Sequence, residues 1–141
     1  MRWALLILGL ASCAETADVP PPGDYLGWKR IDTYGPAPGH GDTYRIIYAN
    51  DVALTFTGGR YPDGTIIVKE IHVNDHDTPG ALVNVEIMRR LGPPPMGLDD
   101  QAGWLFTATA TPNGTEAIKT SCWRRCHVSA PNAGAWLDYR Q

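Results

Sequence analysis

The stretch Thr65-Ile66-Ile67-Val68-Lys69-Glu70-Ile71-His72-Val73 decides the fold, because it carries the strongest strand signal in the chain. Side chains alternate across a strand, so Lys69 shares one face with Ile67 and Ile71. A lysine among apolar side chains is almost never fully buried without a partner. Two interpretations are open. The amine reaches solvent from a half-covered face, or it lies inside a site as a nucleophile or a point of covalent attachment.

The segments on either side repeat this extended pattern. Further strands are expected over 43–49, 81–89 and 103–111, separated by turns rich in Gly, Pro, Asn and Asp. Residues 24–34 fit either a short helix or an extended arm. A helix is expected over 115–127, with Glu116 in its first turn. Because strands joined by turns pair antiparallel, the expected fold is α+β, a small antiparallel β-sheet with a few helices.

The composition bounds the class of protein. The chain has 141 residues, which is enough for one domain with a core of its own. Hydrophobic residues make up 43% and charged residues 19%, as in a globular protein. The formal net charge of -3 gives no reason to expect a nucleic acid or an anionic membrane surface as a partner.

The first residues have the pattern of a secretory signal. Met1-Arg2 is basic, and the apolar run that follows, Trp3 to Ala11, is too short to cross a bilayer. Leu10-Ala11-Ser12-Cys13 resembles a bacterial lipobox, in which the cysteine is lipidated and becomes the first residue. Ordinary cleavage near Ala14 is the alternative. We therefore expect a periplasmic protein whose membrane attachment is a lipid on Cys13, anchored to the outer membrane.

This pattern divides the chain into three parts. Residues 1–12 are expected to be the signal peptide and residues 13–23 a proline-rich tether. Residues 24–141 are expected to form the functional domain.

Two cysteines and a histidine lie together in Cys122-Trp123-Arg124-Arg125-Cys126-His127. Such a group is typical of covalent haem c attachment, in which the sulfurs form thioethers and the imidazole binds the iron. The usual motif has two residues between the cysteines, whereas this chain has three. A Cys122–Cys126 disulfide is an alternative. Zinc is another, but the remaining histidines lack ligand spacing to the pair and fit ordinary surface positions: His40, His72 and His76.

Four motifs in this order resemble the cytochrome P-460 family. They are Tyr44-Arg45-Ile46-Ile47-Tyr48, the run from Tyr61-Pro62-Asp63-Gly64-Thr65 into Val68-Lys69-Glu70, Gly103-Trp104-Leu105-Phe106, and the C-terminal cysteine–histidine motif. The resemblance covers Tyr25 to Tyr139. It implies a small antiparallel sheet with helices, often dimeric, with one covalently attached haem c near the C-terminal helix.

The resemblance implies roles for the residues that would hold the haem. Cys122 and Cys126 would form the thioethers, and His127 would be the proximal iron ligand. Lys69 would bond covalently to the macrocycle, as in the members that oxidise hydroxylamine.

The resemblance also implies a polar pocket on the open side of the haem. Glu86 would be the distal carboxylate that acts as a base, and Arg45 would line the pocket. Strand alternation groups Glu86 with Leu82, Asn84 and Met88.

The implied activity is hydroxylamine oxidation, with electrons passing to an exported acceptor cytochrome and a homodimer as the expected assembly. The related β-sheet cytochromes c-prime share the fold, cap the iron with aromatic side chains, and bind nitric oxide or carbon monoxide. Phe56 and Phe106 are the two phenylalanines available for such a cap. The presence of both Lys69 and Glu86 favours the enzyme over the gas-binding protein.

Overall fold

The computed structural model describes residues 15–92 and 101–141. The expected signal peptide, residues 1–12, and the lipobox cysteine, Cys13, lie outside these ranges. Within them, no helix is long and apolar enough to cross a membrane.

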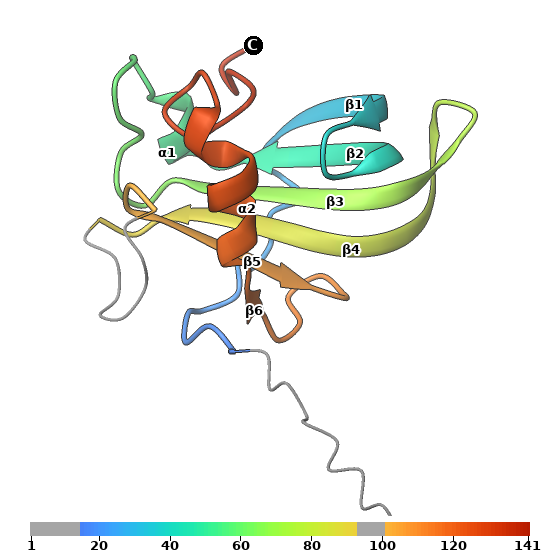
Figure 1. Cartoon of the computed structure of the whole chain (residues 1–141), viewed down its shortest axis with the longest axis horizontal. Helices are drawn as coiled ribbons and strands as arrows, with labels where there is room; N and C mark the ends of the chain where they lie inside the picture. Colours follow the sequence, from blue (N-terminus) through green and yellow to red (C-terminus); the bar gives the residue numbers. More distant parts are fainter. Residues whose placement is uncertain (1–14, 93–100) are drawn as a thin grey trace, which may run out of the picture.

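Six strands form one antiparallel sheet in chain order, so each strand pairs with the one before it (Figure 1). The strands are β1 (Lys29–Ala37), β2 (Gly41–Ala49), β3 (Ile66–Asp75), β4 (Thr78–Arg90), β5 (Trp104–Thr109) and β6 (Ala117–Ile118). The helical segments are short: α1 (Asp51–Leu54), α2 (Thr120–Arg125) and a 3-10 turn, η1 (His127–Ser129). The predicted small antiparallel sheet with a few helices is confirmed, and β1 takes the extended alternative for most of residues 24–34.

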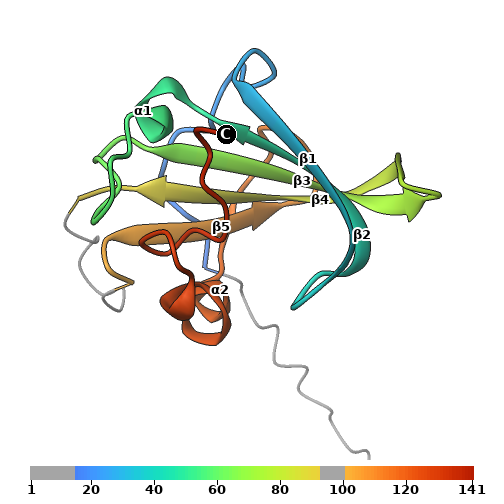
Figure 2. The same cartoon turned by 90° about the horizontal axis from the view of Figure 1, so that it is seen from above.

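Both faces of the sheet carry a core. α2 and the C-terminal segment cross one face, which we call the α2 face, and the N-terminal segment runs behind the other (Figures 1 and 2). The core of the α2 face is mainly aromatic and aliphatic, and includes Ile47, Ile67, Met88, Trp104, Phe106 and Tyr139. The opposite core includes Tyr25, Tyr48, Val68, Val85 and Ile87. Lys69 lies on the α2 face with Ile67 and Ile71, as the alternation predicts.

A β-bulge in β4 changes the expected grouping of side chains. Ile71 pairs with Asn84, but the next residue, His72, pairs with Leu82, so Val83 has no partner across the strand pair. A bulge of this kind reverses the side-chain alternation beyond it. The expectation that Leu82 shares a face with Glu86 is therefore wrong, because Leu82 packs against the opposite core.

The prediction of a helix over 115–127 is also wrong for the first part of this range. Residues 117–118 pair with β5 as β6, and the helix begins only at Thr120. Glu116 is buried with Arg89, which donates to its Oε1 at 2.7 Å, and Thr107 Oγ1 donates to the same carboxylate. This tertiary ion pair explains why a carboxylate with a favourable helical position adopts an extended backbone instead.

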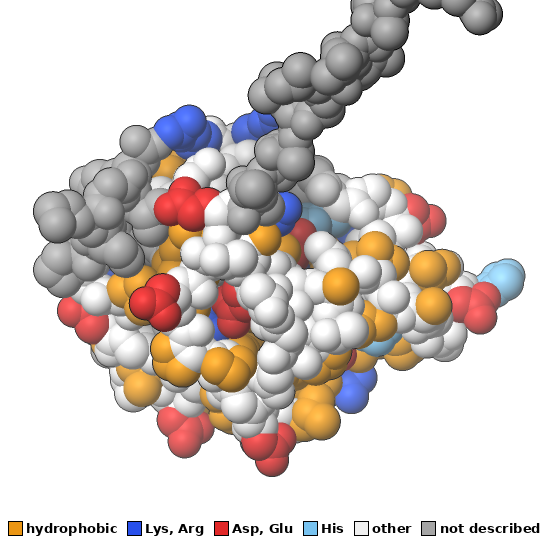
Figure 3. All heavy atoms as spheres, turned by 90° about the horizontal axis from the view of Figure 1, so that it is seen from below, with side chains coloured by type: hydrophobic (Ala, Val, Ile, Leu, Met, Phe, Trp, Pro, Cys, Tyr) orange, Lys and Arg blue, Asp and Glu red, His pale blue; other side chains and the backbone are white. Residues whose placement is uncertain are grey.

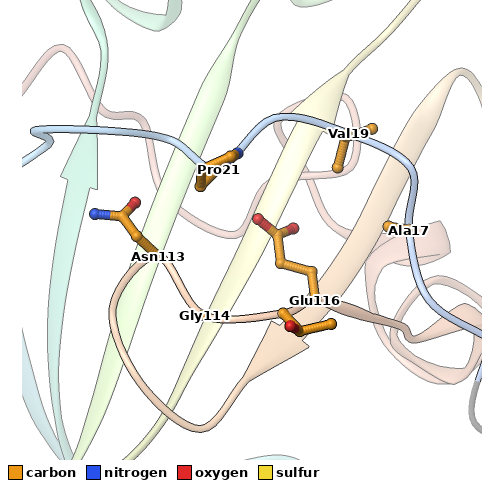
Figure 4. Close-up of a pocket in the computed structure, with 7 residues that line it drawn as sticks. Ala17, Val19, Pro21, Asn113, Gly114 and Glu116 are labelled. Atoms are coloured by element: carbon orange, nitrogen blue, oxygen red, sulfur yellow. The ribbon is translucent and has the colours of Figure 1, made fainter.

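The N-terminal segment packs along the edge strand. Thr16 forms a bridge with Ala117, and the Ala17 N–H donates to the Glu116 carbonyl at 2.9 Å. Figure 4 shows the segment passing over Glu116. The segment and the loop before β6 line an open pocket of about 240 Å³ there. Acidic side chains are dispersed over the underside of the molecule (Figure 3). From Glu15 onward, the stretch expected to be a tether therefore lies on the sheet, where it covers an otherwise open strand edge.

Candidate functional site

Lys69 and Glu86 face each other across the centre of the sheet. They are directly opposed on β3 and β4, and the distance from Lys69 Nζ to Glu86 Oε2 is 2.7 Å. The Lys69 side chain is only 17% exposed, so the amine does not extend into open solvent. The lysine on the apolar face is thus paired within a polar cluster rather than snorkelling from a half-covered face.

His40 completes this cluster from the hairpin between β1 and β2. Its Nε2 lies 2.9 Å from Lys69 Nζ, and its Nδ1 lies 3.8 Å from Glu86 Oε1. The flanking Gly39 and Gly41 have φ of 77° and 65°, a left-handed conformation that favours glycine and lets the hairpin tip turn tightly. The expectation of an ordinary surface histidine is wrong for His40, because its side chain is only 22% exposed.

The pKa values of His40 and Glu86 are shifted by burial and by their charged neighbours. Burial lowers the pKa of His40, the Lys69 charge lowers it further, and the Glu86 carboxylate acts in the opposite direction. Burial opposes ionisation of Glu86, but the Lys69 ammonium and its hydrogen bond outweigh this effect and hold the pKa of Glu86 below its usual value. At neutral pH the cluster therefore contains an ionised carboxylate and a neutral imidazole.

The cysteine pair lies at the end of α2. Cys122 is within the helix, and the backbone N–H of Cys126 donates to the Cys122 carbonyl at 3.3 Å, so the two residues are one turn apart. Both thiols are free and partly buried. Burial raises the pKa of the Cys122 thiol.

His127 follows the pair and is held in one orientation. Its Nδ1 lies 2.8 Å from the Gly134 carbonyl, which can only accept, so Nδ1 carries the proton. Nε2 then keeps its lone pair, and burial lowers the pKa of the imidazole, which keeps it neutral. Gly134 has a φ of 95°, and a Cβ there would lie 2.7 Å from Trp104 Nε1. The backbone that orients His127 therefore depends on a glycine.

The sheet cluster and the cysteine–histidine motif meet on the α2 face. A Cβ placed on Gly39 would lie 3.8 Å from Cys126 Sγ, so the hairpin tip that carries His40 reaches the cysteine pair. The Phe106 ring, on β5, packs against the His127 ring with centroids 4.7 Å apart. The structure thus brings together residues that lie far apart in the sequence.

Arg45 lies on the α2 face, and its guanidinium is hydrogen-bonded to the β1–β2 hairpin. It lies on β2 opposite Ile71, and its guanidinium donates to Thr33 Oγ1 and to the carbonyls of Gly35 and Thr43. These partners all belong to the β1–β2 hairpin. Arg45 therefore braces the hairpin that positions His40, and its charge contributes to lowering the pKa of His40.

The donor set at the end of α2 fits a c-type haem. Thioether formation needs reduced cysteines within reach of one macrocycle, and axial ligation needs an imidazole nitrogen with a free lone pair held by a second-sphere hydrogen bond. Cys122, Cys126 and His127 meet these requirements. Within residues 15–92 and 101–141, no group of three or more His, Cys, Asp or Glu side chains is arranged to hold a metal ion alone, so the zinc alternative finds no ligand set.

Comparison with known proteins assigns most of the chain to one family. The family model described as Cytochrome P-460 matches residues 22–135, which include the sheet cluster and the cysteine–histidine motif. No curated protein matches the chain.

Proposed function

This chain belongs to the cytochrome P-460 family, and from that premise we propose that it is an exported mono-haem cytochrome that oxidises hydroxylamine. Family membership indicates a c-type haem cytochrome; the specific reaction is our proposal. The observation that carries it is the Lys69–Glu86 pair, at 2.7 Å, on the sheet face that the cysteine–histidine motif covers.

We assign the haem-holding roles to four residues. Cys122 and Cys126 would form the thioethers, and His127 would ligate the iron through Nε2, the nitrogen that its bond to Gly134 leaves free. Lys69, the one amine in the cluster with Glu86 and His40, would bond to the macrocycle. When bound, the haem would supply the redox chemistry that takes up the electrons of the substrate.

Glu86 serves as a proton acceptor in this proposal. Conversion of hydroxylamine to nitrous oxide and water releases protons and electrons in equal number, so a nearby base accelerates it. Before the haem bond forms, the Lys69 ammonium keeps Glu86 ionised and holds it in place. The Glu86 side chain is 22% exposed, which gives an accepted proton a path to solvent. Electrons pass to an exported acceptor cytochrome.

The positions of Phe106 and Phe56 argue against the alternative function, a nitric oxide or carbon monoxide carrier with an aromatic side chain capping the iron. Phe106 packs on the ring of His127, the side that we assign to the proximal ligand. Phe56 stacks on Tyr61 within the core, with ring centroids 4.0 Å apart. The polar groups of the Lys69–Glu86 pair suit proton transfer better than passive gas binding.

The proposal extends to the location and assembly of the protein. We propose a periplasmic homodimer held to the outer membrane by a lipid on Cys13. Globomycin, which blocks lipoprotein signal cleavage, should cause an uncleaved precursor to accumulate, and Cys13→Ala should abolish lipid labelling.

One preparation tests the haem and the reaction separately. The full chain is expressed with c-type maturation, denatured and weighed by mass spectrometry; release of the haem on denaturation contradicts covalent attachment. Hydroxylamine turnover is then compared in the wild type, Glu86→Gln and the control Asp75→Asn, a carboxylate that is 68% exposed on the β3–β4 hairpin. We expect loss of turnover only in Glu86→Gln. A haem protein that binds nitric oxide and has no turnover in any form would favour the alternative.

A further inference from the structure

His40 is the third member of the site cluster, beside Lys69 and Glu86. It comes from the hairpin between β1 and β2, while Lys69 and Glu86 come from the centre of the sheet. Its ring contacts both of them, through different nitrogens. A histidine placed between an amine and a carboxylate in this way has the arrangement of a base with its orienting partner.

The hydrogen bonds define which tautomer is present. An ammonium group has N–H donors and no lone pair, so Lys69 donates and His40 Nε2 accepts. The proton of the neutral ring therefore lies on Nδ1, on the side of Glu86 Oε1 at 3.8 Å. A carboxylate at this position stabilises the imidazolium that forms when Nε2 takes up a proton.

An imidazole has an ordinary pKa nearer to neutral pH than a carboxyl group has. A general base works best when its pKa lies near the working pH. The charged neighbours of Glu86 hold its pKa below the ordinary carboxyl value. The pKa of His40 is also lowered, but from the higher imidazole value of 6.5. Lys69, Arg45 and His127 lower the pKa of His40 and Glu86 raises it, so conversion of the Lys69 ammonium to an uncharged amine makes His40 more basic.

We propose that His40 is a second proton acceptor of this site and that it works as a pair with Glu86. This inference rests on the proposed function, because it concerns the protons that hydroxylamine oxidation releases. Once Lys69 carries no charge, the lone pair of His40 Nε2 is available to the substrate. A substrate proton would pass to Nε2 and leave to solvent from the hairpin tip, and the haem, when bound, would take up the electrons for the acceptor cytochrome.

The test compares two histidines that both lie on hairpin tips. His40→Gln keeps a side chain that can hydrogen-bond but cannot take up a proton at neutral pH. His76→Gln is the control, because the His76 side chain is 97% exposed on the β3–β4 hairpin, which projects from the body (Figure 1). Both are made in the full chain and loaded with haem.

The first measurement is the rate of cyanide binding to the ferric protein, which does not depend on turnover. Hydrogen cyanide arrives protonated at neutral pH and binds as the anion, so its proton must pass to a nearby base. We expect His40→Gln to slow binding by about 10²-fold, the usual effect of losing a positioned proton acceptor, and His76→Gln to bind as the wild type does. Equal rates in all three forms would overturn the proposal.

The second measurement is the proton uptake of His40 itself, by NMR of the diamagnetic ferrous carbon monoxide form. The His40 ring resonance is assigned in the wild type through its nuclear Overhauser contacts with the Lys69 and Glu86 side chains, so the assignment does not depend on a variant. We expect its midpoint to fall in Glu86→Gln, because the carboxylate that raises the pKa of His40 is then removed. A wild-type His40 that does not titrate between about pH 4 and pH 8 refutes the proposal, even if His40→Gln fails to fold. Slow cyanide binding in His40→Gln together with no hydroxylamine turnover in the wild type would reject the proposed function alone.

Discussion

Removal of the buried carboxylate of Glu116 should destabilise the fold more than any change on the surface. Glu116 and Arg89 are each 4% exposed, and Arg89 makes two charge-assisted hydrogen bonds to the carboxylate. Glu116→Gln keeps the shape but leaves the Arg89 cation buried without a counter-charge. Breaking one side of a buried ion pair costs about 3–5 kcal/mol. With a urea m-value of about 2 kcal/mol/M, the unfolding midpoint should fall by about 2 M.

The assay is urea unfolding of the full chain followed by tryptophan fluorescence. The control is Arg60→Gln, because the Arg60–Asp63 pair is 58% and 56% exposed and should contribute less than about 1 kcal/mol. Arg89→Met combined with Glu116→Leu should recover much of the lost stability, since it removes both buried charges. A loss in Glu116→Gln no larger than in Arg60→Gln would refute the reasoning.

Three further predictions concern the site. Gly134→Ala should destabilise the protein by about 1–3 kcal/mol more than Gly58→Ala in thermal unfolding, since both have positive φ but a Cβ at Gly58 meets open space; equal losses would contradict this. Because the folded-state pKa of Glu86 is lowered from 4.5, its contribution to stability is present above that value and is lost as pH falls through the folded pKa. Lys69→Met should therefore weaken the acid dependence of urea unfolding between about pH 6 and pH 3, and an unchanged dependence would count against the Lys69–Glu86 pair. In mass spectra of denatured protein, each single cysteine-to-serine variant should keep its haem, whereas Cys122→Ser/Cys126→Ser/Lys69→Met should release it; haem retained in the triple variant would reveal another bond.

The strand pattern was predictable because period-two alternation is a local property of the chain. The strand predicted over Thr65 to Val73 is present in the structure as β3. The same alternation places Lys69 among apolar neighbours on the α2 face. The bulge at Val83 was not predictable from that pattern, because it depends on how β3 and β4 pair. Glu116 shows the same limit: a local helix preference gave way to an arginine 27 positions away.

The site was predictable only where residue type carries the signal. Cysteines followed by a histidine, and a lysine on an apolar face, are visible in the sequence. The role of His40 is not visible in the sequence, because it depends on the direction in which the β1–β2 hairpin bends. The glycines on either side of it are the one local sign of a tight turn. Arg45 lies on the expected strand, but its guanidinium turns to the hairpin backbone.

The docked N-terminal segment has a consequence for how a lipid anchor would orient the protein. Glu15 is hydrogen-bonded to β6, and it lies only two positions after Cys13 in the chain. An extended chain spans at most about 3.5 Å per residue, so a lipid on Cys13 could lie no more than about 7 Å from that attachment point. A connection of this length is too short for the domain to rotate freely about its lipid anchor. The β6 edge would rest near the headgroups, and β1, five strand spacings or about 24 Å across the sheet, would form the outer edge facing the periplasm.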